Sequence, residues 1–189
     1  LPARRRRRDD SLPRTVDAFR RVARMPEPAR RREDLAQLLR DAVEMQEAGQ
    51  PEVRFETAIP EGPVMAELDA TMIGQALTNL LKNAGEAIES LRAAGAPQDH
   101  AAVIRVEMEA GPREAVIRIA DSGIGLPEDR ARLFEPYVTT REKGTGLGLS
   151  IVKKIIEDHG GALTLEDAPV FEGQSRAGAI ATIRLPLPA

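Results

Sequence analysis

"DATMIGQALTNLLKNAGEAIESLRA", from Asp69 to Ala93, is the stretch of sequence that decides the fold. Its apolar residues recur every three or four positions, as they do on one face of an amphipathic helix. Asp69 stands at a natural N-cap position, because its side chain can accept a hydrogen bond from the first helical turn. The sequence therefore predicts one long helix, whose buried stripe consists of Ile73, Ala76, Leu77, Leu80, Ala84, Ile88 and Leu91.

Two asparagines stand at the edge of that stripe. Asn79 and Asn83 are four residues apart, so they lie on one face of the helix, stacked along its axis. An amide oxygen suits Mg²⁺, which proteins usually hold with few side chains plus phosphate oxygens and water. The pair therefore indicates the wall of a pocket. The alternative is a pair of solvated or helix-capping asparagines.

Two runs of alternating polarity follow the helix, "AVIRVEME" at 102–109 and "AVIRIAD" at 115–121. They predict a central antiparallel pair of strands. Asp121 has the same parity as Ile117 and Ile119, so its carboxylate is expected on the buried side of the sheet. Followed by the close-turning "SGIG", it could accept a hydrogen bond from an exocyclic amine such as that of adenine. A strand-ending turn stabilised by Asp is the alternative.

A second glycine-rich stretch, "REKGTGLGLSIVKK", runs from Arg141 to Lys154. It matches neither G-x-G-x-x-G, which would need glycine at Leu149, nor the P-loop. The N–H groups near Leu147 to Ile151 would nevertheless attract an anion, because they lie at the start of an expected helix. Gly160 and Gly161 are expected to end this helix. A flexible loop before a helix is the alternative. Strands near 162–166 and 178–185 complete this half of the chain.

On the N-terminal side of the long helix, "TVDAFRRVARM" at 15–25 and "REDLAQLLRDAVEMQ" at 32–46 have helical periodicity. The alternation around 53–57 and the run 62–68 predict two strands joined as a hairpin. Helices and antiparallel strands mix without regular alternation. The expected class is therefore α+β, with one sheet and helices packed on one face.

Composition excludes several kinds of function. The 189 residues contain no cysteine, so there is neither a disulfide framework nor thiol chemistry. The formal net charge is -3, with positive charge concentrated near the start, and no nucleic-acid partner is expected. The run Arg4 to Arg8 is interpreted as a solvated end, and a patch for anionic lipid or nucleic acid is the alternative. No apolar run reaches membrane-spanning length, and a chain that begins at Leu1 is expected to be a fragment.

Four motifs combine these features: "NLLKNAGEA", "DSGIGLP", "LFEPYVTT" and "KGTGLGLSIV". In this order they resemble the N, G1, F and G2 boxes of the histidine-kinase ATP-binding domain, a member of the GHKL superfamily. The resemblance covers roughly residues 32 to 186. It implies a two-layer α+β sandwich with a mixed, mostly antiparallel sheet, and a site for ATP and Mg²⁺.

The resemblance also implies roles for individual residues. Asn83 would be the Mg²⁺ ligand and Asn79 would support the phosphates, which makes these two the catalytic candidates. Asp121 would bind adenine, helped by Gly123 and Gly125. A lid beginning at Phe134 and the glycine-rich stretch would hold the nucleotide, with Arg141 or Lys143 neutralising the γ-phosphate. The nucleotide-binding candidates of this part are Phe134, Thr140, Arg141, Lys143, Gly144, Thr145, Gly146, Leu147 and Gly148.

Two positions depart from patterns in the superfamily. Hydrolytic members carry a Glu where this chain has Asn79, and Asn cannot act as a general base near neutral pH. Transfer to a protein acceptor is therefore favoured over rapid hydrolysis. Many related kinases have a basic residue three places after the second Asn, where Glu86 stands here, so the lid cations are expected to substitute.

The phosphoacceptor histidine is missing. Neither His100, expected in an exposed loop, nor His159, expected to serve packing or the helix dipole, has the required sequence context. "TVDAFRRVARMPEP" resembles the end of the second dimerisation helix of nitrogen-regulation sensor kinases of the NtrY type. We therefore expect residues 1–30 to be an arm plus part of that helix, and residues 31–189 to be the catalytic domain.

The resemblance implies the catalytic domain of a two-component sensor kinase. Its partners would be its own dimerisation domain and the receiver domain of a response regulator. The expected setting is cytoplasmic, within a full-length protein that is anchored in the inner membrane. The fragment itself is expected to be a monomer or weak dimer, and not to autophosphorylate alone. The alternatives are another GHKL protein kinase, such as the anti-sigma type, and a nucleotide-gated interaction module.

Overall fold

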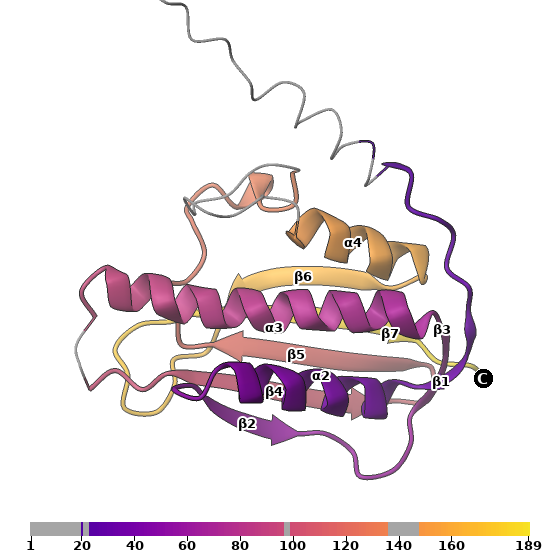
Figure 1. The fold of residues 1–189 in the computed structure, drawn as a ribbon, viewed down its shortest axis with the longest axis horizontal. Helices are drawn as coiled ribbons and strands as arrows, with labels where there is room; N and C mark the ends of the chain where they lie inside the picture. Colours follow the sequence, from indigo (N-terminus) through magenta and orange to yellow (C-terminus); the bar gives the residue numbers. More distant parts are fainter. Residues whose placement is uncertain (1–19, 21–22, 97–98, 136–147) are drawn as a thin grey trace, which may run out of the picture.

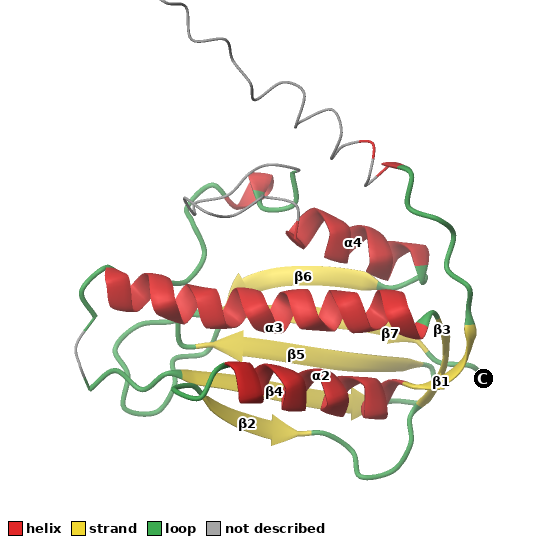
Figure 2. Cartoon of the chain, in the orientation of Figure 1, coloured by secondary structure: helices red, strands yellow, loops and turns green. Residues whose placement is uncertain are grey.

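The computed structural model describes residue 20 and residues 23–96, 99–135 and 148–189. They form two layers, with helices on one face of a sheet (Figures 1 and 2). The expected α+β class and the packing of helices on one face are confirmed. The elements are β1 (Arg31–Asp34), α2 (Leu35–Gly49), β2 (Arg54–Ala58), β3 (Met65–Leu68), α3 (Ala70–Ala93), β4 (Val103–Ala110), β5 (Glu114–Asp121), a short 3₁₀ helix η1 (Arg130–Arg132), α4 (Gly148–Asp158), β6 (Ala162–Asp167) and β7 (Ala179–Pro186).

The main sheet has the order β2-β4-β5-β7-β6. The β2–β4 pair is parallel, and the other pairs are antiparallel. The predicted pair of alternating runs forms β4 and β5, in a register that sets Ile104 opposite Asp121. The sheet is therefore mixed and mostly antiparallel, as expected, with β5 in the middle.

The predicted hairpin of β2 and β3 is wrong. Both strands form, but β2 pairs in parallel with β4, whereas β3 pairs with β1 in a separate two-stranded sheet. The partner of β3 is instead the strand at residues 31–34. The sequence pattern predicts that a helix begins at residue 32, within this strand. Local alternation predicts a strand but not its neighbour, because pairing depends on where the rest of the chain lies.

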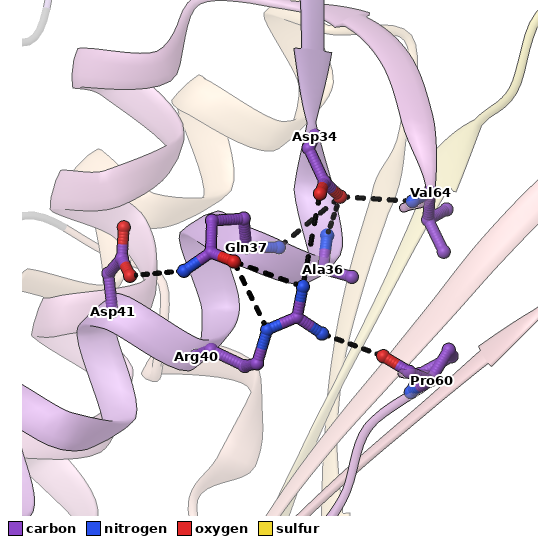
Figure 3. A network of polar contacts seen from close by, with 7 residues as sticks. All are labelled: Asp34, Ala36, Gln37, Arg40, Asp41, Pro60 and Val64. Carbon is purple, nitrogen blue, oxygen red and sulfur yellow. Dashed lines mark hydrogen bonds and ion pairs between the residues drawn. The ribbon is translucent and has the colours of Figure 1, made fainter. Parts of the chain in front are cut away.

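Asp34 marks the true start of α2 (Figure 3). Its Oδ1 accepts hydrogen bonds from the backbone N–H groups of Ala36, at 3.1 Å, and Gln37, at 3.3 Å, as an N-cap does. The same oxygen accepts from the N–H of Val64 at 2.9 Å. Arg40 donates to the carbonyl oxygen of Pro60 at 2.7 Å. One carboxylate therefore ties β1 and α2 to the segment that enters β3.

The long helix α3 confirms its predicted range, stripe and cap. Every member of the predicted stripe is buried, and all of them except Leu91 belong to the main core, as does the fully buried Leu81. Asp69 caps the helix by accepting from the N–H of Met72 at 3.1 Å. Predicted helix α4 also forms, and its buried residues Val152, Ile155 and Ile156 join the same core.

The connection before β1 is fastened to two helices. Ala29 N–H donates to the second carboxylate oxygen of Asp69 at 3.0 Å, and the Arg30 guanidinium donates to the carbonyl oxygen of Asp158 at the end of α4. Of the predicted helix at 15–25, the described part contains one helical hydrogen bond, from Arg24 N–H to Arg20 O. The domain boundary at residue 30 stays a prediction. No helix in the described ranges is long and apolar enough to cross a membrane.

Candidate nucleotide site

Asp121 lies at the end of the central strand with its side chain buried, as parity predicts. It is only 5% exposed. Its Oδ1 accepts a hydrogen bond from the N–H of Gly123 at 2.8 Å, and Ala179 N–H at the start of β7 approaches the same oxygen at 3.5 Å. A buried carboxylate with backbone donors on one oxygen has a fixed orientation. It is therefore suited to accept a hydrogen bond from a ligand that enters beside α3.

Glycines allow the chain to pass closely around this carboxylate. A β-carbon at Gly123 would lie 2.5 Å from the carbonyl carbon of Ala87, so this turn packs directly against the backbone of α3. Ile124 N–H completes the contact by donating to Ala87 O at 3.0 Å. Gly125 has φ +84°, a left-handed conformation that favours glycine. These glycines thus allow the close turn beside Asp121, and their helping role in nucleotide binding stays a prediction.

His100 belongs to the surroundings of this turn, and the expectation that it is simply exposed is wrong. It is half-buried, and its Nε2 donates to the carbonyl oxygen of Ser122 at 2.6 Å. Ser122, which sequence reasoning did not single out, is 1% exposed. Its hydroxyl donates to Ala101 O and accepts from Val103 N–H, both at 2.9 Å. No local sequence pattern predicts these contacts, because they join residues about twenty positions apart.

Asn79 and Asn83 lie on α3 and are partly exposed, as expected for the edge of the buried stripe. Asn83 faces the start of α4: a β-carbon at Gly148 would lie 3.8 Å from Asn83 Nδ2 and 4.0 Å from its Oδ1. The structure thus brings Asn83 and Gly148 together. A helix N-terminus attracts phosphate, and the Asn83 amide oxygen beside it fits a metal held mainly by phosphate oxygens and water. Among the described residues, no group of three or more His, Asp or Glu side chains is arranged to hold a metal ion.

Phe134, the first predicted residue of the lid, is partly buried and packs against the main core. The ammonium group of Lys153 lies 4.9 Å from the centre of its ring, a cation–π contact that sequence reasoning missed. Glu86, the acidic residue three places after Asn83, is half-buried and lies 3.9 Å from the ammonium group of Lys82 in an ion pair. The remaining predicted positions, Thr140, Arg141, Lys143, Gly144, Thr145, Gly146 and Leu147, lie outside the described residues.

His159 is buried, with 2% of its surface exposed, and has two hydrogen-bond partners. Its Nδ1 lies 2.7 Å from the carbonyl oxygen of Ile155, and its Nε2 accepts from Asp69 N–H at 3.0 Å. An acceptor at Nε2 and a donor at Nδ1 define the neutral Nδ1–H tautomer. His159 therefore joins the end of α4 to the start of α3, in keeping with its expected packing role.

A match to a protein-family model places this architecture in a known class. Residues 68–189 match the family described as histidine kinase-, DNA gyrase B-, and HSP90-like ATPase. The chain belongs to this family.

Individual relatives narrow the class. The chain is 48% identical over 164 residues to the nitrogen regulation protein NtrY of Azorhizobium caulinodans, a match that covers 85% of this chain and 20% of that protein. The predicted resemblance to histidine-kinase ATPase domains of the NtrY type is confirmed. The chain spans about a fifth of the length of this relative.

Solved structures of histidine kinases share the fold. The mycobacterial sensor histidine kinase MprB superimposes with a TM-score of 0.69 at 26% identity, covering 85% of this chain and all of that one. Full-length ShkA in complex with AMPPNP superimposes with a TM-score of 0.68 at 27% identity, covering 95% of this chain and 36% of that one. The two-layer ATPase fold predicted from the sequence is therefore confirmed.

Proposed function

We propose that this chain binds Mg-ATP and transfers the γ-phosphoryl group to a histidine on the dimerisation domain of a two-component sensor kinase. The phosphoryl group then passes to an aspartate of a response-regulator receiver domain. The observation that carries the proposal is the buried, backbone-oriented carboxylate of Asp121, in the same domain as Asn83 facing the start of α4. The ShkA relative supports it, because that protein is described in complex with AMPPNP, a nucleotide with the shape of ATP.

Each part of the site has a chemical task. Asp121 accepts a hydrogen bond from the adenine amine, and Gly123 and Gly125 let the backbone turn next to the base. Asn83 supplies an amide oxygen to Mg²⁺, which neutralises charge on the phosphates, and Asn79 supports the same region. The N-terminus of α4 at Gly148 favours negative charge. The lid residues beginning at Phe134 cover the nucleotide.

Transfer rather than hydrolysis follows from the residues that flank the phosphates. A bond forms between the γ-phosphorus and an imidazole nitrogen of the acceptor as the bond to the β-phosphate oxygen breaks, and ADP leaves. The nucleophile belongs to the partner domain, so this chain contributes positioning and charge neutralisation. Asn79 provides no general base that would activate water. We therefore expect slow ATP hydrolysis, and no autophosphorylation by this chain alone.

The wider setting is part of the same proposal. The partners are the kinase's own dimerisation domain and a receiver domain, with no nucleic acid. The relative NtrY suggests nitrogen regulation as the process. We propose a cytoplasmic location, as the intracellular part of a membrane-anchored sensor. An isolated chain should be monomeric or weakly dimeric.

Calorimetric titration with ATP, ADP and GTP, each with and without Mg²⁺, tests the proposal. Asp121→Asn should weaken ATP binding roughly 10- to 100-fold, the loss of one hydrogen bond to a charged group. Asn83→Ala should make ATP affinity insensitive to Mg²⁺. The matched controls are Asp41→Asn and Gln75→Ala, which change exposed residues of α2 and α3 and should leave the affinity unchanged.

A second assay separates a kinase from the alternatives. The chain is mixed with ATP labelled at the γ-phosphate and a separately produced dimerisation domain that carries the histidine. Labelled phosphohistidine, which is stable in base and labile in acid, supports the kinase. ATP binding without labelling favours a nucleotide-gated interaction module. Acid-stable phosphoserine on a partner would instead favour a kinase of the anti-sigma type.

A further inference from the structure

The connection between β6 and β7, residues 168–178, covers the face of the sheet opposite the helices near the end of β5. Figure 1 shows it as the yellow loop at the left, running between the end of β6 and the start of β7. The proposed ATP site uses no residue of this connection. Yet the connection contains a buried aromatic side chain, Phe171, which is 5% exposed.

Phe171 forms a small apolar cluster that is separate from the main core. Its members are Val103, Ala120, Ala168 and Phe171, with Ile180 packed against them. Ala120 immediately precedes Asp121, and neighbouring strand residues point to opposite faces. Phe171 therefore supports from behind the strand end that presents the Asp121 carboxylate on the other face.

Polar contacts cover and extend this support. The guanidinium of Arg105 lies 4.7 Å from the centre of the Phe171 ring and is held by Glu56, at 2.8 Å. Gln174 Nε2 donates to Ala101 O at 2.8 Å. The Ser122 hydroxyl donates to the same carbonyl oxygen at 2.9 Å. The connection is thus attached to the residue directly after Asp121 through a shared acceptor.

The end of the connection touches Asp121 itself. A β-carbon at Gly178 would collide with the backbone carbonyl oxygen of Asp121, and it would lie 2.9 Å from Oδ1. The next residue, Ala179, directs its N–H toward Oδ1 at 3.5 Å. The orientation of the carboxylate therefore depends on where residues 178–179 enter β7. Phe171 and Gln174 anchor the chain that leads to them.

We propose that Phe171 is a positioning residue for Asp121, and that it sets the preference of the site for the 6-amino group of adenine. The inference rests on the proposed function, because it needs a bound purine nucleotide. Without the ring, the end of β5 and the start of β7 lose their common support. The carboxylate then samples orientations that no longer match the amine.

The experiment measures the affinities of intact chain and Phe171→Ala for ATP and for inosine triphosphate, which carries an oxo group in place of the 6-amine. Phe171→Ala should weaken ATP binding about tenfold, the worth of one misplaced hydrogen bond. Binding of inosine triphosphate should hardly change, so the preference for adenine collapses. A purely structural role would weaken both nucleotides by the same factor. Phe171→Leu, which keeps an apolar anchor, should restore most of the preference.

Two controls separate positioning from lost stability. Phe55→Ala removes a half-buried phenylalanine that packs on the main core, so it should lower stability without changing the adenine preference. Val170→Ala changes the adjacent side chain, which is 53% exposed, and should change neither. If Phe171→Ala does not fold, Gln174→Ala decides, because it loosens the same connection at an exposed hydrogen bond.

The outcomes are distinct. The deciding quantity is the ratio of the affinities for ATP and for inosine triphosphate. If this ratio is unchanged in folded Phe171→Ala, or in Gln174→Ala where Phe171→Ala does not fold, the inference is overturned and the proposed function stands. Failure of the intact chain to bind ATP overturns the proposed function, and the inference falls with it. A ratio that falls for Phe171→Ala but not for Phe55→Ala supports both.

Discussion

At the residue scale, Asp69 joins three parts of the chain. Its two carboxylate oxygens accept separately from the N–H groups of Met72 and Ala29, and its own N–H donates to His159. The hydrogen bond from Met72 is the largest influence that holds the pKa of Asp69 below its ordinary value of 3.8, while partial desolvation opposes it. The folded chain therefore favours the charged form of this cap.

The pH dependence of stability follows from that direction. Because the pKa of Asp69 is lower in the folded state, its contribution is complete above the unfolded value of 3.8 and is lost as pH falls through the folded pKa. Asp69→Ala should cost about 1 kcal/mol of unfolding free energy at pH 7. Urea unfolding of both proteins from pH 7 down to pH 3 should show this difference shrinking below about pH 4. A difference that stays constant to pH 3 would contradict the assignment, with Glu61→Ala as the exposed control.

At the scale of elements, β1 and α2 share a junction. Asp34 ends one and caps the other, and its Oδ1 also accepts from Val64 N–H just before β3 (Figure 3). Within the described sheets, β1 pairs only with β3. The position of this small sheet relative to α2 therefore depends on the junction at Asp34. One side chain thus fixes the relative position of a helix and two strands.

Asp34→Ala should therefore cost more than an ordinary cap. We expect a loss of about 2 kcal/mol, since the helix cap contributes about 1 kcal/mol and the cross-link to Val64 a similar amount. The measurement is equilibrium unfolding in urea, with hydrogen exchange of the Val64 amide as the local probe. Asp41→Ala removes an exposed side chain that accepts a hydrogen bond from Gln37, and it should cost less than about 0.5 kcal/mol. Equal costs for the two variants would refute the special role of Asp34.

At the scale of the whole molecule, the candidate site draws on distant parts of one chain. Asp121 comes from the end of β5, Asn83 from α3, Gly148 from the start of α4, and Ala179 from the start of β7. The other end of α4 is joined to the start of α3 by His159. A ligand that bridges these elements should therefore stabilise the complete fold rather than one part of it.

Thermal unfolding should report that linkage. At an ATP concentration of 100 times Kd, binding to the folded state adds about 2.7 kcal/mol of unfolding free energy. For a chain of this size, this corresponds to a rise in Tm of about 5 to 10 °C. Differential scanning fluorimetry with Mg-ATP should show the rise for the intact chain and for Asp41→Asn. Asp121→Asn at the same ATP concentration should show a much smaller one, and an equal rise would argue against adenine recognition by this carboxylate.

The sequence by itself determined features that repeat at short range. Helical spacing predicted α3 with its stripe and its Asp69 cap, and strand parity predicted the burial of Asp121. The four motifs predicted the ATPase family, because each motif is a short run of neighbouring residues. These signals are local, so they can be recognised without knowing where the rest of the chain lies.

Only the tertiary structure decided what those elements contact. β2 pairs with β4 rather than with β3, and residues 31–34 form a strand because β3 offers them an edge. His100 meets Ser122, and Phe171 packs beneath Ala120, through contacts that span many positions. Alternation or periodicity specifies a face but not the partner that covers it, because partners are chosen by the packing of the whole chain. The sequence therefore identified the carboxylate, and the fold determined what holds it in place.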